Sequence, residues 1–266
     1  MSSLRLHPIA LAGAMATATI ASRAAAVHLG DVFLAVDNGA IATGDIVSED
    51  QIDLHVRVFK AKFGDSGFPG FTANPGFDCF AGTFQPGTKI GFDVLDALKV
   101  WNGLEFVATG GETMTISFLS LSVTTGAGPV PGFELAVQPN GGFHRHYNMF
   151  LNGVGGGEPA SGVYLLERKL YSTDPAVGPS ESFWFVLGHD ASDAEIDAAY
   201  EYMLAKIAPA PCPGDLDGNN AIDGADLGAM LAAWGTTDAA ADLNADGIVD
   251  GADLGALLSL WGAVCR

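Results

Sequence analysis

The sequence predicts a mainly β protein: an antiparallel β-sandwich or jelly-roll-like domain with a C-terminal helix, followed by a small α-helical module. Short β-branched and aromatic runs, several with period-two alternation, fill residues 28 to about 188. Turn signals such as NPG, QPG and PNGG separate these runs. No helix of useful length interrupts them, and parallel strands would need crossover helices, so antiparallel pairing is expected.

The individual strands follow from these runs. KVWNGLEFV places Asn102 and Gly103 between two apolar arms, which predicts a hairpin with a two-residue turn. The other expected strands cover residues 31–36, 52–59, 113–123, 132–137, 147–151, 162–172 and 182–188.

One helix is expected after the strands. Ser192 and Glu195 have the spacing of a capping box, in which the hydroxyl and the carboxylate each bind a backbone amide of the first turn. The apolar residues that follow at helical spacing are Ile196, Tyr200, Met203, Leu204 and Ile207. The stiff, Pro-rich stretch APAPCPG then indicates a domain boundary.

Composition limits the classes of partner. The 266 residues are 48% hydrophobic with 16 Phe, enough for a sizeable core, and a length of this kind fits one or two domains. Acidic residues outnumber basic ones 31 to 12, giving a formal net charge of −19. This balance argues against nucleic acid and against anionic membrane surfaces, both of which bind basic patches.

The first 26 residues have the pattern of a secretory signal peptide. Arg5 precedes the apolar run IALAGAMATATIAS, and the small residues of RAAAV favour cleavage after Ala26. The alternative is a buried first helix. No later stretch is a transmembrane candidate, so we expect no membrane insertion. A secreted protein is expected, either extracellular or held at the cell surface by a protein scaffold.

A duplicated motif lies near the C-terminus. GDLDGNNAIDGADLGAMLAAWG begins at Gly214, and ADLNADGIVDGADLGALLSLWG begins at Ala241. Both copies place oxygen-bearing side chains at positions 1, 3, 5, 9 and 12 of a loop, the spacing of EF-hand calcium loops, which also use the carbonyl at position 7. The expected Ca²⁺ ligands are Asp215, Asp217, Asn219, Ala221, Asp223 and Asp226 in the first loop, and Asp242, Asn244, Asp246, Ile248, Asp250 and Asp253 in the second.

Each loop should lead into a short helix. Position 6 requires a sharp turn, for which Gly247 and Asn220 are suited. The helices carry matching apolar stripes, which we expect to pack against each other when calcium closes the loops. These stripes are Leu227, Met230, Leu231 and Trp234, and Leu254, Leu257, Leu258 and Trp261.

Two loop–helix units after a Pro-rich stretch closely resemble a type I dockerin, over residues 212–266. The resemblance implies two bound Ca²⁺ ions and docking to a cohesin-type module, often on a scaffold for polysaccharide degradation. Alternatives are an acidic solvated tail, thrombospondin-type calcium repeats, or a calcium module with another partner. In dockerins, partner contacts involve loop positions 10 and 11, often a hydroxyl pair. Here these positions hold Gly224, Ala225, Gly251 and Ala252, which lack hydroxyls.

These features divide the chain into a signal peptide over residues 1–26, a β-sandwich domain over 27–207, a linker over 208–213 and the dockerin-like module over 214–266. Cys212 and Cys265 flank that module, and we expect a disulfide between them in an oxidising compartment. A zinc site is the alternative, although no histidine follows His189. Cys79 is then left over, and we expect it to be buried.

Two histidines form a further candidate site. GGFHRHYNMF places His144 and His146 on the same face of an expected strand, and His28 lies near the predicted mature terminus. Neutral imidazoles are good ligands for copper or zinc. The alternative is a solvated face beside Arg145 and Tyr147. His55 lies on another expected strand.

The β region carries no catalytic motif such as GxSxG or HExxH. The favoured hypothesis is a secreted, non-catalytic β-sandwich, structural or glycan-binding, that is anchored through the dockerin-like module. A glycan ligand would be favoured by exposure of Trp101 or Trp184. The alternative is an extracellular carbohydrate-active enzyme, either a glycoside hydrolase with two facing carboxylates or a metal-dependent oxidase.

Overall fold

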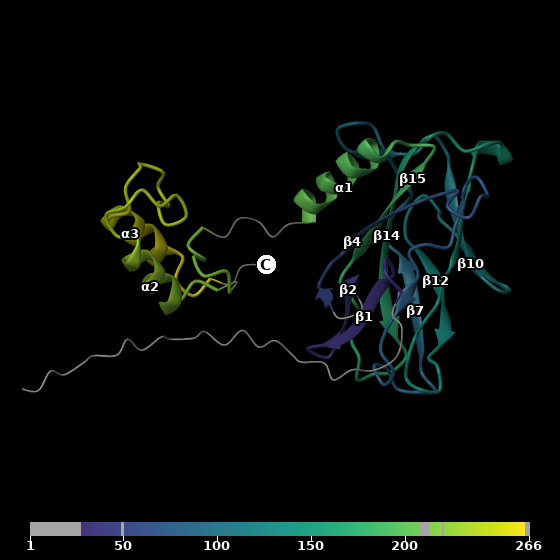
Figure 1. Cartoon of the computed structure of the whole chain (residues 1–266), viewed down its shortest axis with the longest axis horizontal. Coiled ribbons are helices and arrows are strands. Elements are labelled where there is room, and N and C mark those ends of the chain that lie inside the picture. Colours follow the sequence, from purple (N-terminus) through teal and green to yellow (C-terminus); the bar gives the residue numbers. More distant parts are fainter. Residues whose placement is uncertain (1–27, 49–50, 208–212, 220, 264–266) are drawn as a thin grey trace, which may run out of the picture. The chain divides into compact units, whose positions relative to one another are not determined.

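The computed structural model describes residues 28–48, 51–207, 213–219 and 221–263 (Figure 1). The expected signal peptide and most of the expected linker lie outside these residues. The structure is 36% strand and 16% helical, which confirms a mainly β fold. The chain divides into two compact units, the first ending at Ala191 and the second beginning at Ser192, with Gly103–Glu105 belonging to the second.

The described residues form three sheets, of which two are four-stranded. The first consists, in spatial order, of β3 (Gln51–Leu54), β2 (Ala40–Ser48), β1 (Val32–Asp37) and β6 (Phe77–Asp78). The second consists of β11 (Leu121–Thr124), β10 (Thr113–Phe118), β13 (Asn148–Asn152) and β5 (Phe71–Thr72).

The third sheet has seven strands. Its main order is β12 (Val130–Ala136), β7 (Lys89–Val94), β14 (Gly162–Ser172), β15 (Phe183–His189) and β4 (Val58–Lys62). β8 (Lys99–Trp101) pairs with both β14 and β9 (Phe106–Ala108). A short 3₁₀ helix, Val154–Gly156, precedes β14.

Among the described residues, ten of the twelve strand pairings are antiparallel, as expected, and two are parallel, which corrects the expectation in part. β6 pairs parallel with β1, and β4 pairs parallel with β15. Parallel neighbours need a long crossover connection. Among the described residues, intervening strands make both crossovers and no α-helix does. The absence of helical patterns from this region therefore did not exclude parallel pairing.

Two predicted strands are each divided by a turn. β3 ends at Leu54, His55 adopts a φ of 68°, and β4 then begins in a different sheet. Similarly, residues 113–123 form the hairpin of β10 and β11, with Leu119 at a φ of 52°. Neither turn contains Gly, Pro, Asn or Asp, and Ser120 alone, in the second turn, belongs to the residue types that favour turns, so the sequence indicated both turns poorly.

The hairpin at Asn102 is confirmed, but its loop is longer than predicted. β8 pairs antiparallel with β9, and Trp101 lies opposite Phe106. The loop is therefore Asn102–Glu105 instead of two residues. Gly103 adopts a φ of 98°, which a residue without a side chain tolerates most easily.

One apolar cluster forms the core of the first unit, and all three sheets contribute to it. Val32, Met114 and Phe92, one residue from each sheet, are fully buried. Arg168 of β14 is also fully buried. Five aromatic rings surround its guanidinium carbon, with centroids 4.1 to 5.9 Å away. Nothing in the sequence pattern of β14 indicated a buried cation.

The helix α1 (Asp193–Ile207) confirms the predicted helix and its cap. The backbone amide of Ser192 donates to Glu195 Oε2 at 2.9 Å, and the amide of Glu195 donates to Ser192 Oγ at 3.3 Å. Ile196 and Met203, both predicted on the apolar face, are buried.

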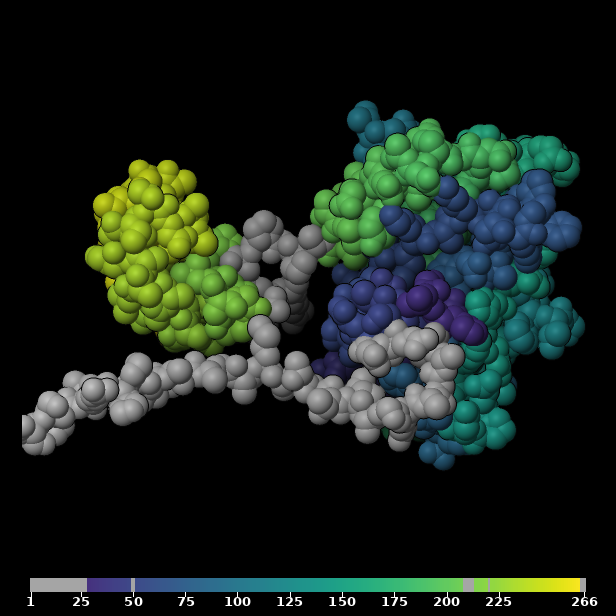
Figure 2. All heavy atoms as spheres, in the orientation of Figure 1, coloured from purple at the N-terminus to yellow at the C-terminus, as the bar shows by residue number. Residues whose placement is uncertain are grey.

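Residues 213–263 contain α2 (Gly224–Ala232) and α3 (Gly251–Ser259), the two helices that the repeat predicts. Their atoms form a small, closely packed body, coloured yellow-green to yellow in Figure 2. The core of this body consists of Ile222, Met230, Ala241, Val249 and Leu257.

Among the described residues, no helix combines the length and the apolar character needed to cross a bilayer.

Candidate metal centres

The aspartate at position 12 of the first loop organises that loop's backbone. Asp226 is fully buried. Its Oδ1 accepts hydrogen bonds from the amides of Leu216 at 2.7 Å and Asp217 at 3.3 Å, and its Oδ2 accepts one from Asp223 at 2.8 Å. Burial opposes ionisation of this carboxyl, but these amide bonds outweigh burial and lower its pKa. Asp226 therefore carries a negative charge into the centre of the loop.

Other carboxylates of the first loop face the same centre. Asp215 Oδ1 accepts hydrogen bonds from the amides of Gly218 at 2.9 Å and Asn219 at 3.1 Å. One oxygen from each of Asp215, Asp217 and Asp226 lies within 4.8 Å of the other two. The structure thus brings together three of the predicted ligands. Ala221, whose carbonyl was predicted as a ligand, donates its amide to Asn219 Oδ1 at 2.8 Å.

The second loop repeats the hydrogen bonds from loop amides to these carboxylates, whereas the cluster of three carboxylates is found in the first loop alone among the described residues. Asp253 is fully buried and accepts hydrogen bonds from the amides of Asp250 at 2.8 Å and Asn244 at 3.1 Å. The bond from the Asp250 amide is the main cause that lowers the pKa of Asp253, against the opposing effect of burial. Asp242 Oδ1 accepts from the amide of Asp246 at 3.1 Å, as Asp215 does from the equivalent residue of the first loop.

The turn at position 6 is confirmed in the second loop. Gly247 adopts a φ of 96°, and its amide donates to Asp242 Oδ2 at 2.8 Å. Ile248, the position-7 residue, donates its amide to Asp246 Oδ1 at 3.1 Å. Asn220, the equivalent of Gly247, lies outside the described residues.

The residue at position 9 caps the helix that follows each loop. Asp223 has φ −143° and ψ −158°, and Asp250 has φ −144° and ψ −157°. Each side chain accepts a hydrogen bond from the amide two residues later, at 2.8 Å. Together with Asp226 and Asp253, they form two capping boxes of the same geometry. The duplicated sequence therefore folds into duplicated structure.

Each loop also pairs with the chain that follows the other helix. Position 8 of each loop exchanges two backbone hydrogen bonds of 2.8 to 3.0 Å with that segment. These hydrogen bonds relate the two loop–helix repeats by an approximate twofold symmetry. The pairs are Ile222 with Gly262 and Ala263, and Val249 with Gly235 and Thr236.

The apolar stripes pack only in part as expected. Met230 and Leu257 are fully buried in the shared core. Leu227 and Leu254 are half-buried and pack against this core, whereas the other four stripe residues are exposed, which corrects the expectation that the whole stripes pack together. The helices end at Ala232 and Ser259, so the tryptophans lie beyond their last turns, and position-8 residues fill the core instead. The exposed fractions are 53% for Leu231, 45% for Trp234, 51% for Leu258 and 47% for Trp261.

The predicted partner-binding positions are on the surface. Gly224, Ala225, Gly251 and Ala252 are all exposed at the first turns of α2 and α3. The predicted disulfide of Cys212 and Cys265 lies outside the described residues. Cys79 is buried, as predicted, and its Sγ accepts a hydrogen bond from the amide of Phe143 at 3.1 Å.

A second candidate centre lies in the first unit, where two distant segments flank β6. On one side β1 pairs with β6, and the amide of Val32 donates to the carbonyl of Gly76 at 2.9 Å. On the other side Phe77 and Arg145 exchange backbone hydrogen bonds of 2.8 and 3.0 Å. β6 thereby holds the turn that carries His28 beside the extended segment around Arg145.

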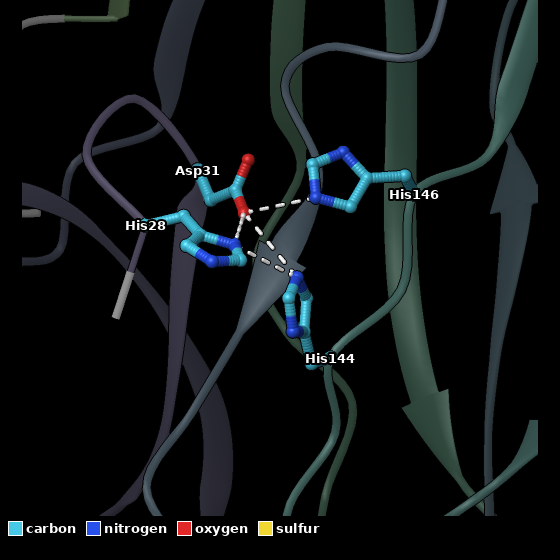
Figure 3. A group of neighbouring side chains, drawn as sticks. All are labelled: His28, Asp31, His144 and His146. Atoms are coloured by element: carbon cyan, nitrogen blue, oxygen red, sulfur yellow. Dashed lines mark hydrogen bonds and ion pairs between the residues drawn. The ribbon is translucent and has the colours of Figure 1, made fainter. Parts of the chain in front are cut away.

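Three histidines meet one carboxylate at this place (Figure 3). Asp31 Oδ2 lies 3.7 Å from His28 Nδ1, 4.0 Å from His144 Nε2 and 3.3 Å from His146 Nε2. His28 Nδ1 and His144 Nε2 are 3.0 Å apart. The four donor atoms all lie within 4.8 Å of one another. The prediction that His144 and His146 face the same side is confirmed, although both precede β13.

Asp31 was not predicted as part of this site. Only its spacing from His28, in the stretch HLGD, could have indicated it. Its Oδ1 accepts a hydrogen bond from the amide of Gly76 at 2.8 Å, which aims Oδ2 at the histidines. The backbone amide of His28 donates to Asp78 Oδ2 at 3.3 Å and so anchors the turn on β6. His55 does not join the cluster and instead lies 3.4 Å from a carboxylate oxygen of Asp37.

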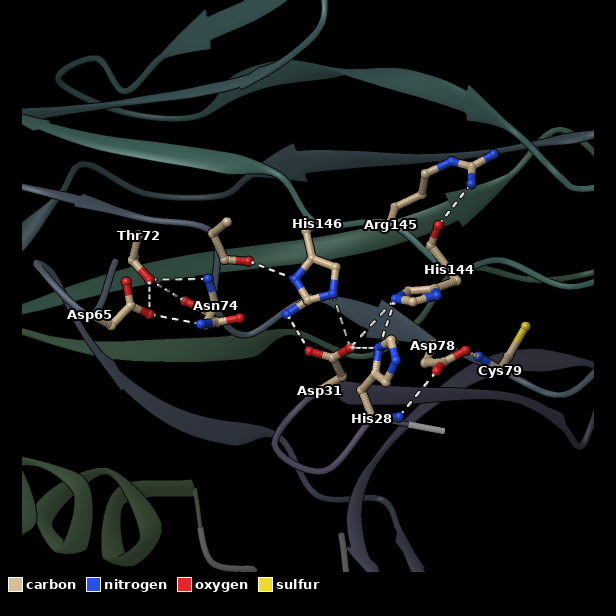
Figure 4. A network of polar contacts seen from close by, with 12 residues as sticks. His28, Asp31, Asp65, Thr72, Asn74, Asp78, Cys79, His144, Arg145 and His146 are labelled. Carbon is tan, nitrogen blue, oxygen red and sulfur yellow. Dashed lines mark hydrogen bonds and ion pairs between the residues drawn. The ribbon is translucent and has the colours of Figure 1, made fainter. Parts of the chain in front are cut away.

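A polar network supports the segment that faces His146 (Figure 4). His146 Nδ1 lies 3.0 Å from the carbonyl oxygen of Ala73. Asp65 Oδ2 accepts hydrogen bonds from Thr72 Oγ1 at 2.9 Å and Asn74 Nδ2 at 2.7 Å, on either side of Ala73. These bonds fix the carbonyl that orients the imidazole.

The tryptophans do not favour glycan binding by the β region. Trp101 and Trp184 are half-buried. The ring of Trp101 lies 5.2 Å from that of Phe106, and the guanidinium carbon of Arg57 lies 5.7 Å from the ring of Trp184. A glycan ligand therefore gains no support from either indole.

Comparison with known proteins assigns no family, because the chain matches no protein-family model and no curated protein sequence.

Proposed function

We propose that residues 213–263 form a calcium-dependent docking module of the type I dockerin kind. In this proposal the module anchors the preceding β region to a cohesin-type protein module on an extracellular scaffold. The observation that carries the proposal is the equivalence of the two loops. Both use position 9 as a helix cap, both bury the aspartate of position 12, and both pair through position 8.

The donor set fits calcium. Ca²⁺ takes six to eight oxygen ligands, which both loops offer from aspartate and asparagine side chains and a backbone carbonyl. A carboxylate has about four lone-pair sites. Three amides already bind the carboxylate of Asp226, which leaves about one site for a metal. Asp226 would therefore bind Ca²⁺ through one oxygen, whereas the glutamate of an EF-hand binds through two.

Charge supports a requirement for metal. Aspartate is the only charged residue type between residues 213 and 263. In the first loop, carboxylate oxygens of Asp215, Asp217 and Asp226 lie within 4.8 Å of one another, where like charges repel. Two Ca²⁺ ions, one in each loop, would supply the compensating positive charge. Helices as short as α2 and α3 are unstable alone, so metal binding and folding should be coupled.

The exposed apolar residues offer a docking surface. Leu231 and Trp234 after the first loop, and Leu258 and Trp261 after the second, are each about half exposed. Large exposed apolar side chains that cluster commonly mark protein interaction sites, and tryptophan is enriched among residues that dominate binding energy. Because the two sets are equivalent, a cohesin-type partner could bind in either of two orientations.

The β region is the passenger in this proposal. We infer a sandwich-like arrangement, because residues of all three sheets share one apolar core. A non-catalytic role is preferred because the β region carries no catalytic motif. The expected location is extracellular, on a scaffold of the kind that serves polysaccharide degradation.

Binding of the full chain to an immobilised type I cohesin module tests the proposal. Surface plasmon resonance in excess calcium and in excess chelator should show binding only with calcium. The double variant Asp226→Ala, Asp253→Ala should lose binding. Asp238→Ala is the matched control, because this aspartate lies in the same body but in neither loop, and it should keep binding. Calcium uptake by calorimetry without cohesin binding would reject docking while leaving the calcium sites standing.

A further inference from the structure

We propose that His28, Asp31, His144 and His146 form a binding site for one divalent transition-metal ion, with zinc as the ion that fits the donor set. The site lies in the first unit and does not depend on the calcium module. It would join the turn before β1 to the segment before β13 across β6, and so act as a metal staple in the β region.

The separations of the donor atoms match a four-coordinate ion. Zn–N and Zn–O bonds of about 2.0 to 2.2 Å place the ligands of a tetrahedral ion about 3.3 to 3.5 Å apart. The observed separations from Asp31 Oδ2 are 3.3, 3.7 and 4.0 Å, and that between His28 Nδ1 and His144 Nε2 is 3.0 Å. Of these four separations, the largest exceeds the tetrahedral range by about half an ångström, and all four donors lie within 4.8 Å of one another.

The tautomer of His146 leaves a lone pair at the centre of the cluster. The carbonyl oxygen of Ala73 can only accept, so the contact of 3.0 Å places a proton on His146 Nδ1. In the neutral ring, Nε2 is then an acceptor, and it faces the carboxylate oxygen of Asp31 at 3.3 Å. Two acceptors at this distance require a positive charge between them. A ligand histidine held by a carbonyl at its other nitrogen is the usual arrangement around a bound metal.

Asp31 gives an independent indication. Its side chain is only 4% exposed, and Oδ2 is buried with no hydrogen-bond partner among the described residues. A buried carboxylate oxygen without a partner is costly unless a cation compensates it. The bond from the Gly76 amide to Oδ1 prevents Oδ2 from turning away. A metal ion would satisfy this oxygen and three imidazole nitrogens together.

Protonation is the competing explanation. A proton on His146 Nε2 would make an imidazolium–carboxylate pair with Asp31. One proton, however, serves one pair of atoms, whereas four donors converge here. Protonating all three histidines would place three positive charges within a few ångströms of one another.

Because imidazole nitrogens suit zinc and copper whereas Ca²⁺ prefers oxygen, the two metal classes would occupy separate parts of the chain.

The site is accessible from solvent. The exposed side-chain fractions are 54% for His28, 35% for His144 and 34% for His146. A metal ion could therefore enter without unfolding of the β region. Asp31 closes the buried side and the imidazoles form the open side (Figure 3).

Zinc binding by the full chain tests the proposal. The protein is stripped with chelator and returned to excess calcium, and Zn²⁺ is then titrated by calorimetry. One equivalent is expected to bind, and thermal unfolding of the β region should move to higher temperature. The double variant His144→Ala, His146→Ala should lose this binding, and Asp31→Asn, which alters a direct ligand, should weaken it by at least about 10- to 100-fold, the range seen when residues that only orient metal ligands are altered. His55→Ala, another histidine beside a carboxylate, should bind as the wild type does.

Cobalt provides a second readout on the unmutated chain. Co²⁺ in a four-coordinate nitrogen and oxygen site absorbs strongly in the visible, and Zn²⁺ should abolish that absorption by displacement. The proposal is wrong if the wild type binds no Zn²⁺ or if the double variant binds it equally well. Circular dichroism must show that the double variant remains folded, and His144→Gln, His146→Gln replaces it if it does not. Asp226→Ala should leave zinc binding intact, which separates this result from that for the calcium module.

Discussion

A methyl group on Gly76 would lie 2.6 Å from Cε1 and 2.8 Å from Nε2 of His146, because the imidazole lies directly against the Gly76 α-carbon. Such distances are too short for any real contact, so Gly76→Ala must displace the ring. We expect this change to weaken zinc binding by about 10- to 100-fold, as for other changes that misalign a metal ligand. Calorimetry measures the loss.

Gly128→Ala is the control for that experiment. A methyl group at Gly128 meets no atom within 4 Å, so the same substitution there should leave zinc affinity unchanged. Equal zinc affinity of Gly76→Ala and the wild type would show that the orientation of His146 is irrelevant to binding.

Arg168 allows a test of how the core tolerates a charge. Its three guanidinium-group nitrogens are buried without hydrogen-bond partners among the described residues, and burial lowers its pKa to about 10. Cation–π contacts offset part of the desolvation cost. We expect Arg168→Met to leave stability unchanged or to raise it by up to about 4 kcal/mol, as seen when buried charges are replaced by apolar residues of similar volume.

Arg168→Ala is the matched variant, because it removes both the charge and the volume. It should lower the free energy of unfolding by about 2 to 5 kcal/mol through the cavity that it leaves. Urea denaturation of both variants makes the comparison. If Arg168→Met destabilises the protein as much as Arg168→Ala, the aromatic contacts of the guanidinium are strongly favourable.

Cys79 should be unreactive in the folded protein. Burial raises the pKa of its thiol to about 11, against the opposing effect of hydrogen bonds from Thr83 and Phe143. The thiolate is the reactive form. Labelling by a thiol reagent at pH 8 should therefore be slow until urea unfolds the chain, and Cys79→Ser identifies the signal. Because the folded-state pKa is raised, Cys79 loses protons later than in the unfolded chain, so its contribution to stability falls as the pH rises from about 9 to 11. Fast labelling under native conditions would show that the thiol is open to solvent.

The two equivalent docking faces predict an unusual mutational pattern. Trp234→Ala removes one face and leaves the other, so cohesin affinity should fall by only about twofold, which corresponds to about 0.4 kcal/mol. Trp261→Ala should have the same small effect. The double variant should lose binding altogether. A single variant that abolishes binding would show that only one face is used.

Some of this structure could be predicted from the sequence because it depends on local spacing. The capping box of Ser192 and Glu195, the helices after each loop and the common face of His144 and His146 all follow from positions a few residues apart. Asp31 and His144 lie more than 100 residues apart, and they meet because β6 pairs with β1 on one side and with Arg145 on the other. Sequence spacing carries no information on these pairings. The same holds for the parallel partners β4 and β15, and for the charge of Arg168 inside an aromatic core.

Hydrogen exchange by mass spectrometry on the full chain tests the central claim most directly, because it reads each part of the chain separately. In excess calcium, the amides of α2 and α3 and those bound to Asp226 and Asp253 should be protected. In excess chelator they should exchange rapidly, while β14 and β15 in the first unit remain protected in both conditions. Equal protection of residues 213–263 with and without calcium would contradict the account, because the repeated loops would then fold without the metal that their carboxylates are proposed to bind.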